Sequence, residues 1–172
     1  YMDINQIQLI ILKKTFTKGD YLRRVNIIRE YLESRFFKNN KENFLGYLSS
    51  IRGSQHDREG LSMLDEHFFN LFTRDNLYPL INGLLEKLKA LPILTLYLSV
   101  LLDDYLIDEL GAWFRQNLNP ELIMEVRCNP TLVAGAAYVW NNKYHDLSLH
   151  YFFAQKENII NTIINAYVNE QL

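Results

Sequence analysis

Hydrophobic positions in the first ninety residues recur every three or four residues, as they do along one face of an α-helix. Polar residues occupy the opposite faces, so no stripe buries its apolar side alone. Breaks such as Arg52-Gly53-Ser54 separate the stripes, and Asp20 is the expected N-cap of the second one. The pattern therefore predicts a helical bundle. The predicted helical segments are 4–11, 21–36, 42–51, 61–72 and 77–91.

At Pro92 the pattern changes from a helical period to mixed helices and strands. Alternating residues predict strands at 94–99 and 122–128, with a helix over 102–114 between them. Asn141-Asn142 separates two short apolar runs, and two residues that tolerate positive φ are typical of a type I′ hairpin turn. A last helix is expected from Leu149 onward.

This order of elements predicts an α+β protein with two small domains. The first is an all-helical bundle over residues 1–91, and the second is a small α/β domain over residues 92–172. The second domain is expected to hold a mixed sheet that includes the hairpin.

Composition narrows the class of protein. The 172 residues carry 18 Lys and Arg against 20 Asp and Glu, so no excess of positive charge points to nucleic acid. A hydrophobic share of 48% with 22% charged residues excludes a long disordered chain. A single cysteine, Cys128, excludes an internal disulfide framework and fits a reducing compartment. No stretch reaches the ~18 apolar residues of a membrane span, so we expect a soluble chain or one peripheral to a membrane complex.

The sequence lacks the motifs of common catalytic sites. It has no phosphate-binding loop, no GxGxxG turn, no HExxH and no paired CxxC. A metal site at His145, Asp146 and His150 is conceivable, but their spacing crosses a predicted strand-to-helix junction and leaves convergence open. We therefore expect no active site, no metal, no cofactor and no small-molecule substrate.

Three other reactive side chains have structural interpretations. His56 and His67 are isolated in the sequence, and isolated histidines are more often packed or on the surface than metal ligands. Cys128 lies in a predicted strand without a neighbouring base, so we expect it to be a small core residue and no nucleophile.

The stretch from Leu122 to Ser148 reads LIMEVRCNPTLVAGAAYVWNNKYHDLS. It resembles the delta subunit of bacterial rotary ATP synthases and its mitochondrial counterpart, the oligomycin-sensitivity-conferring subunit. That family has an alternating strand, Asp-Pro-Ser-Leu-Ile-Gly-Gly, an apolar strand, Gly-Asp-Lys, and a strand ending Asp-Gly-Ser before the last helix. The residues that match or replace this signature are Asn129, Pro130, Leu132, Gly135, Asp146 and Ser148.

The resemblance covers residues 92–172, and the first ninety residues share only helicity and order with the family. Three positions depart from the family pattern. Asn129 stands where the family has Asp, and Ala134 and Leu147 each replace a glycine. Ala134 confines the backbone to negative φ in most cases, so the local turn is expected to differ there.

The resemblance implies a non-catalytic stator subunit that resists rotor torque during proton-driven ATP synthesis. In the family, the helical domain holds N-terminal segments of the alpha subunits, and the C-terminal domain holds the b-type stalk. The resemblance thus implies a cytoplasmic location, peripheral at the inner face of the bacterial plasma membrane through the complex.

The last helix carries the residues that we expect to contact the stalk. They are Phe152, Phe153, Ile160, Ile163 and Tyr167. An equally good interpretation is that they pack this helix onto its own sheet. Two other functions stay open: a helical adaptor or regulatory subunit of another assembly, and a small hydrolase or transferase whose site the sequence does not reveal.

Overall fold

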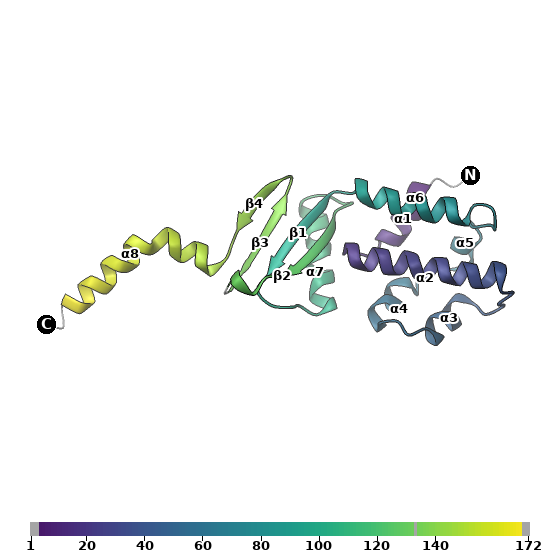
Figure 1. The fold of residues 1–172 in the computed structure, drawn as a ribbon, viewed down its shortest axis with the longest axis horizontal. Coiled ribbons are helices and arrows are strands. Elements are labelled where there is room, and N and C mark those ends of the chain that lie inside the picture. The colour runs from purple at the N-terminus through teal and green to yellow at the C-terminus, as the bar shows by residue number, and fades with distance from the viewer. Residues whose placement is uncertain (1–3, 133, 170–172) are drawn as a thin grey trace. The chain divides into compact units, whose positions relative to one another are not determined.

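The computed structural model describes residues 4–132 and 134–169, with side chains up to residue 167 (Figure 1). Its described part forms eight α-helices and four strands, which confirms the predicted α+β class. The helices are α1 (Ile4–Leu12), α2 (Lys18–Phe37), α3 (Phe44–Ser50), α4 (Gln55–Leu61), α5 (Glu66–Phe69), α6 (Leu77–Ala90), α7 (Asp104–Asn117) and α8 (Leu149–Asn169). The strands are β1 (Ile93–Leu98), β2 (Ile123–Cys128), β3 (Ala136–Trp140) and β4 (Lys143–Asp146).

The chain divides into two compact units that we call the helical unit and the sheet unit. The helical unit holds residues up to Ile93 together with Asp103–Met124, and the sheet unit holds Leu94–Leu102 together with Glu125 onward. The sequence places the boundary between residues 91 and 92. In the structure the chain crosses between the units more than once, because α7 belongs with the helices that precede β1.

The helical unit is built around α2. This helix packs between α6 and α4, and α1 also packs on α6 (Figure 1). Tyr31 of α2 is buried against Phe44 and Phe69, with ring centroids 4.9 Å away in each case. Burying an aromatic or aliphatic side chain of this size stabilises a fold by about 1.5–3 kcal/mol. The apolar stripes seen in the sequence therefore converge on one core.

The start of α2 differs from the sequence prediction. Thr17, not Asp20, is the N-cap, and its hydroxyl oxygen accepts a hydrogen bond from the Asp20 backbone N–H at 3.1 Å. The same hydroxyl donates to the Asp20 carboxylate at 2.7 Å. Asp20 thus occupies the third helical position of a reciprocal cap, and the prediction that it is the N-cap is wrong.

The single helix predicted over residues 61–72 is also wrong. The chain leaves α4 after Leu61, turns, and begins α5 at Glu66. The turn is closed by the Leu64 N–H, which donates to the Leu61 carbonyl at 3.0 Å. Asp65 then caps α5, because its carboxylate accepts from the Phe68 N–H at 3.0 Å. A periodic apolar stripe does not reveal such a break when the core-facing residues keep their spacing across it.

Arg115 of α7 fastens this helix within the helical unit. Its guanidinium donates to the carbonyls of Leu12, Thr15 and Leu122, and it lies over the ring of Phe16 at 4.6 Å from the centroid. The loop between α1 and α2 and the start of β2 are thereby joined to α7. Burial lowers the Arg115 pKa to about 10.

The sheet unit contains a four-stranded mixed sheet in the order β2-β1-β3-β4. β3 pairs antiparallel with both β1 and β4. The hairpin between β3 and β4 turns at Asn141 and Asn142, whose φ values are 49° and 60°. This confirms the predicted hairpin, since positive φ at both central residues is what a type I′ turn requires.

Candidate functional site

The first part of the family signature forms the connection from β2 to β3. Asn129 donates its backbone N–H to the Leu98 carbonyl at 2.7 Å, which ties this connection to the end of β1. The Asn129 side-chain oxygen accepts from the backbone N–H of Thr131 at 3.2 Å. A short 3₁₀ turn, η1 (Pro130–Leu132), follows, and its Leu132 side chain is buried. Asn129 thus stabilises this turn through a side-chain oxygen, which an aspartate would also supply. Val133 lies outside the described residues.

Gly135 brings this connection against the start of α8. Its φ of 97° is one that side chains rarely adopt, and a Cβ there would lie 2.6 Å from the Leu147 carbonyl oxygen. Next to it, the Ala134 carbonyl accepts from the Leu149 N–H at 2.9 Å. Ala134, which stands where the family pattern has a glycine, thus contributes its backbone carbonyl to this junction.

The last signature residues cap α8. The Asp146 carboxylate accepts a hydrogen bond from the Ser148 backbone N–H at 2.8 Å. Hydrogen bonding from the Ser148 side chain and backbone lowers the Asp146 pKa. The Ser148 hydroxyl in turn accepts from the Tyr151 N–H at 3.2 Å, and Ser148 is buried. Gly135 therefore meets Asp146 and Ser148, which come after the hairpin, at one junction, and this junction fixes where α8 begins.

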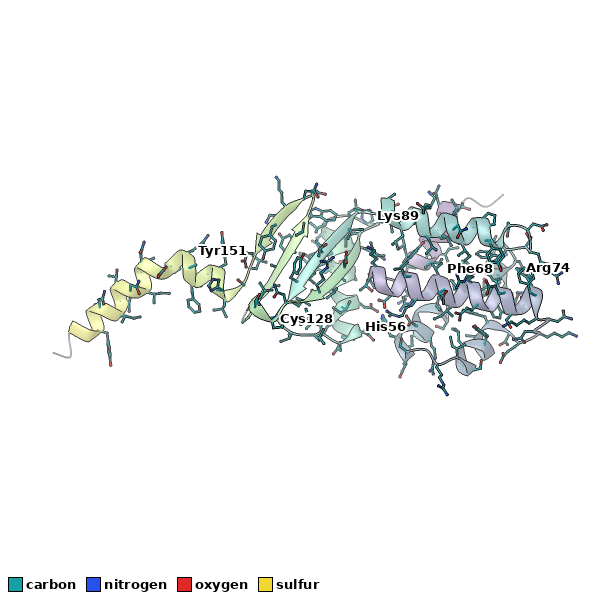
Figure 2. The ribbon with its side chains drawn as sticks, in the orientation of Figure 1. His56, Phe68, Arg74, Lys89, Cys128 and Tyr151 are labelled. Atoms are coloured by element: carbon teal, nitrogen blue, oxygen red, sulfur yellow. The ribbon has the colours of Figure 1, made fainter. Side chains whose placement is uncertain are left out.

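The residues predicted to contact a partner lie along α8 and are largely uncovered. Phe152, Phe153, Ile163 and Tyr167 are each 52–64% exposed, and Ile160 is half-buried. Figure 2 shows the side chains of this helix, with Tyr151 labelled in its first turn, standing clear of the strands. The alternative, that these residues pack α8 onto its own sheet, is not what the structure shows; their role toward a partner stays a prediction.

Within the described residues, His145, Asp146 and His150 do not form a group able to hold a metal ion, although the charge of His150 does act on Asp146. His145 stacks on Tyr138 across the hairpin, with ring centroids 4.6 Å apart, and Asp146 is engaged by Ser148. Cys128 at the end of β2 is exposed (Figure 2), so the expectation that it is a core residue is wrong. The alternating pattern missed this because β2 is buried at its start and emerges into solvent toward its end.

A polar cluster inside the helical unit was not foreseen from the sequence. His56 of α4 has its Nε2 3.5 Å from an Asp20 carboxylate oxygen of α2 and 3.6 Å from one of Asp108 on α7. Among the residues that the structure describes, this is the one group of three side chains able to hold a metal ion. Nothing in the local sequence signals it, because the three residues lie on three separate helices.

Two arginines supply positive charge beside this cluster. Arg24 is fully buried and donates to Asp57 at 3.2 Å, to the Thr15 hydroxyl at 2.9 Å and to the His56 carbonyl at 3.1 Å. Arg23 pairs with both Asp20 and Asp57. The carboxylates are thus balanced by guanidinium groups, and the arrangement is best understood as a polar contact that joins the helices.

Asp57 and Asp108 lie at the edge of this network, and their pKa values are shifted in opposite directions. Burial alone would raise the pKa of Asp57, but hydrogen bonds and charge from Arg23, with help from Ser54 and Arg24, hold that pKa below its usual value. The Asp108 pKa is raised, chiefly by burial, although the nearby His56 opposes this. One Asp108 oxygen has no hydrogen-bond partner among the described residues. Asp57 is therefore the acid that stabilises the network in its ionised form.

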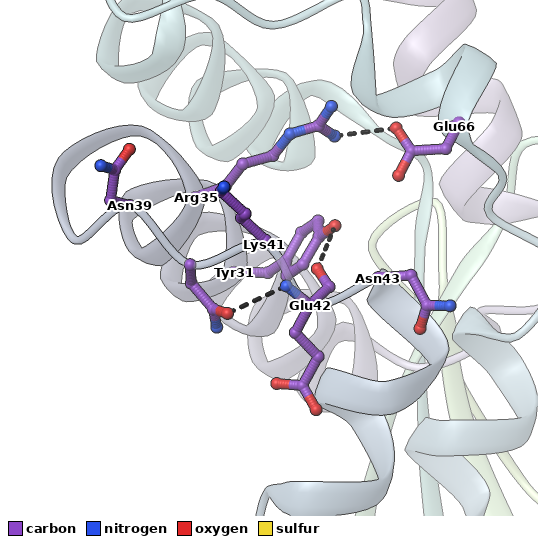
Figure 3. A pocket seen from close by; sticks show the side chains of 8 residues that line it. Tyr31, Arg35, Asn39, Lys41, Glu42, Asn43 and Glu66 are labelled. Atoms are coloured by element: carbon purple, nitrogen blue, oxygen red, sulfur yellow. Dashed lines mark hydrogen bonds and ion pairs between the residues drawn. The ribbon is translucent and has the colours of Figure 1, made fainter.

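A polar pocket of about 340 Å³ lies where α2 ends (Figure 3). Arg35 pairs with Glu66 at 2.9 Å on one side, and the Tyr31 hydroxyl donates to the Glu42 carbonyl at 3.3 Å on the other. Asn43 lines the pocket but its side chain caps α3. The Tyr31 hydroxyl and the Arg35 and Glu66 side chains at this pocket are thus engaged in contacts with one another's elements.

A second hollow, of about 190 Å³, runs between α1 and α6. Leu9 on its wall is half exposed, whereas Gln8 beside it is buried and its amide nitrogen has no hydrogen-bond partner among the described residues. Lys87 from α6 reaches Asn5 across the hollow. The lining of this hollow is mixed, with polar and charged side chains from Asn5, Gln8, Lys87 and Glu121 beside four apolar residues.

Comparison with known proteins does not assign this chain to a family. The sequence matches no family model, and no curated protein matches it either. Within the described residues, no helix combines the length and the apolar character that crossing a membrane demands. The resemblance to the delta subunit family therefore depends on the residues of this chain alone.

Proposed function

We propose that the chain is a non-catalytic peripheral-stalk subunit of a rotary ATP synthase. In this role it links the catalytic head to the b-type stalk and keeps the head from turning with the rotor. It is peripheral at the inner face of the bacterial plasma membrane, held there through the complex.

The observation that carries this proposal is the junction between the hairpin and α8. Gly135, Asp146 and Ser148 match the family pattern in residue type and spacing, and each has a specific structural task there. The order of elements agrees with the resemblance, with helices first and then β1, α7, β2, the hairpin and a last helix. Agreement of residues, spacing and element order supports the proposal more strongly than helical content alone.

The two units also offer separate surfaces, as a linking subunit needs. The helical unit has the hollow between α1 and α6, which suits a short segment of a head subunit. The sheet unit has the exposed apolar side chains of α8, which suit a stalk helix. A subunit under torque needs broad contacts on both partners, because no single small site holds against a sustained load.

Co-purification tests this proposal. The full chain, carrying an affinity tag, is expressed in its native host, and the recovered proteins are identified by mass spectrometry. We expect alpha subunits and b-type stalk subunits to be recovered together. Stable recovery of an unrelated assembly without ATP synthase subunits would instead support the adaptor or regulatory function.

A reconstitution assay adds a functional readout. ATP synthase stripped of the chain is expected to lose proton-driven ATP synthesis and to regain it when the chain is added back. The isolated head is expected to hydrolyse ATP equally well with or without the chain, since a mechanical link takes no part in the chemistry. A chain-dependent change in hydrolysis by the isolated head would contradict a purely mechanical role.

A further inference from the structure

Three side chains from three helices bring one nitrogen and two oxygen atoms close together inside the helical unit. Asp20 comes from α2, His56 from α4 and Asp108 from α7, and one such atom from each lies within 4.8 Å of the other two. All three helices belong to the same compact unit. The motifs whose absence led us to expect no metal describe ligands that are close along the chain. They do not bear on a group that only tertiary packing assembles.

The separations within this group are those of metal ligands. The His56 Nε2 lies 3.5 Å from the Asp20 Oδ2 and 3.6 Å from the Asp108 Oδ1. Zinc bonds to imidazole and carboxylate are about 2.0–2.2 Å long, so two ligands of a tetrahedral ion are roughly 3.4 Å apart. A direct N–H···O hydrogen bond is shorter, at about 2.7–3.2 Å. The spacing of these atoms therefore suits a small cation between them better than a shared proton.

Asp108 contributes an oxygen that lacks a partner. Its Oδ1, the atom that faces His56, is buried and accepts no hydrogen bond from the described residues. Folded proteins rarely leave a buried carboxylate oxygen unpaired, and a bound ion is one of the usual reasons when they do. This atom is thus an independent indication of a ligand at the place where the three side chains converge.

The charges around the group also favour a cation. Arg23 pairs with Asp20 and Asp57. Arg24 pairs with Asp57 and acts on Asp108 only over a longer distance. Three carboxylates therefore face two guanidinium groups, and neither guanidinium contacts Asp108 among the described residues. The uncompensated negative charge lies at the carboxylate whose oxygen is unpaired.

The surroundings of the two carboxylates give them different parts in binding. The Asp20 carboxylate is held by its neighbours, because Arg23 donates to one oxygen and the Thr17 hydroxyl donates to the other at 2.7 Å. Such outer hydrogen bonds commonly orient metal-binding carboxylates. Asp20 is buried, whereas the Asp108 side chain is 31% exposed and leaves a path from solvent. The site thus has a fixed inner ligand and an accessible outer one.

We propose that Asp20, His56 and Asp108 bind one Zn²⁺ ion, with a water molecule as the fourth ligand. An imidazole with two carboxylates suits Zn²⁺, whereas Mg²⁺ and Ca²⁺ prefer oxygen ligands and take six or more of them. The bound ion joins α2, α4 and α7 and thereby stabilises the packing of the helical unit. This site goes beyond the proposed stator function and does not depend on it.

Zinc binding by the full chain, after bound metal has been removed with a chelator, tests this proposal. Calorimetry is expected to give one Zn²⁺ per chain, and zinc is expected to raise the Tm because it binds the folded state. His56→Ala and Asp108→Asn are each expected to weaken binding at least about tenfold and to diminish the rise in Tm. The matched control is Glu109→Gln, which removes the neighbouring, exposed carboxylate of α7 and is expected to leave the zinc affinity unchanged.

Co²⁺ in place of zinc reports the ligands directly through its visible absorption. A tetrahedral Co²⁺ spectrum in the wild type that changes in Asp108→Asn would establish this carboxylate as a ligand. Asp108→Asn keeps the shape of a partly exposed side chain, so it tests the site even where His56→Ala disturbs folding, which circular dichroism would reveal.

Three results would overturn the proposal. The wild-type chain could bind no zinc, zinc binding could be equally strong in both variants, or Mg²⁺ and Ca²⁺ could compete with zinc on equal terms. The second result would assign the binding to histidines outside this group. None of these measurements uses an ATP synthase subunit, so failure of the zinc site and failure of the proposed function are separate results.

Discussion

A Cβ at Gly135 would lie 2.6 Å from the Leu147 carbonyl oxygen, so these two residues approach as closely as they do only because Gly135 has no side chain. The contact holds the β2–β3 connection against the residue that precedes the cap of α8. Backbone atoms cannot move aside as a flexible side chain can, and the φ of 97° adds a second demand for glycine.

Gly135→Ala is therefore expected to destabilise the sheet unit by about 1–3 kcal/mol. Hydrogen exchange of the β3 and β4 amides measures this locally, together with thermal unfolding of the whole chain. Gly53→Ala is the control, since its added Cβ meets only the Ile51 side chain at 3.6 Å. Equal protection of the hairpin in both variants would show that the junction tolerates a side chain.

Arg115→Met is expected to destabilise the helical unit by about 2–4 kcal/mol, because three carbonyls lose their donor at a partly buried position. Chemical denaturation followed by circular dichroism at 222 nm gives the change in the free energy of unfolding. Arg127→Met removes an exposed arginine that pairs with Glu125, and it is expected to cost less than about 0.5 kcal/mol. If Arg115→Met lowered the free energy of unfolding no more than Arg127→Met does, the role of Arg115 in holding α7 in the helical unit would be contradicted.

Asp57→Asn is expected to destabilise the chain at neutral pH by roughly 1–3 kcal/mol, since buried Arg24 loses its charged partner. The Asp57 pKa is lower in the folded state than in the unfolded chain. Its stabilisation is therefore complete above the unfolded value, about 3.9, and is lost as the pH falls through the lower folded pKa.

Unfolding free energies at pH 7, 5 and 3 check this. The difference between wild type and Asp57→Asn should be constant from pH 7 to 5 and become smaller toward pH 3. Glu59→Gln, an exposed change on the same helix, serves as the control and should show little difference at any of these pH values. A difference for Asp57→Asn that grows on acidification would contradict the lowered pKa.

Ending the chain after Ser148 removes α8 and, on the proposed function, the stalk contact. Binding to the b-type subunit is expected to fall at least about tenfold, because the apolar surface of α8 supplies the interface. Head binding should persist, and hydrolysis by the isolated head should be unchanged. Affinity measurements with each partner separate the two surfaces, and loss of head binding on this truncation would show that the surfaces are not separate.

Local features of the fold followed from the sequence because local spacing causes them. Period-3.6 stripes located most of the helices, and Asn141-Asn142 identified the hairpin turn from the φ values that asparagine tolerates. The helix caps were predicted less accurately. Thr17 and Asp20 compete for the same end of α2, and which one lies outside the helix depends on backbone angles that composition does not reveal.

By itself, the sequence determined the α+β class, the order of elements from residue 92 onward and the pattern spanning residues 129–148. Each of these depends on residues that are neighbours along the chain. Tertiary structure decided that His56 lies between Asp20 and Asp108, that Arg115 joins α7 to the α1–α2 loop, and that most of the apolar side chains of α8 are exposed. These depend on which distant segments pack together, and a single sequence contains the energetic reasons for that packing without displaying the distances that result.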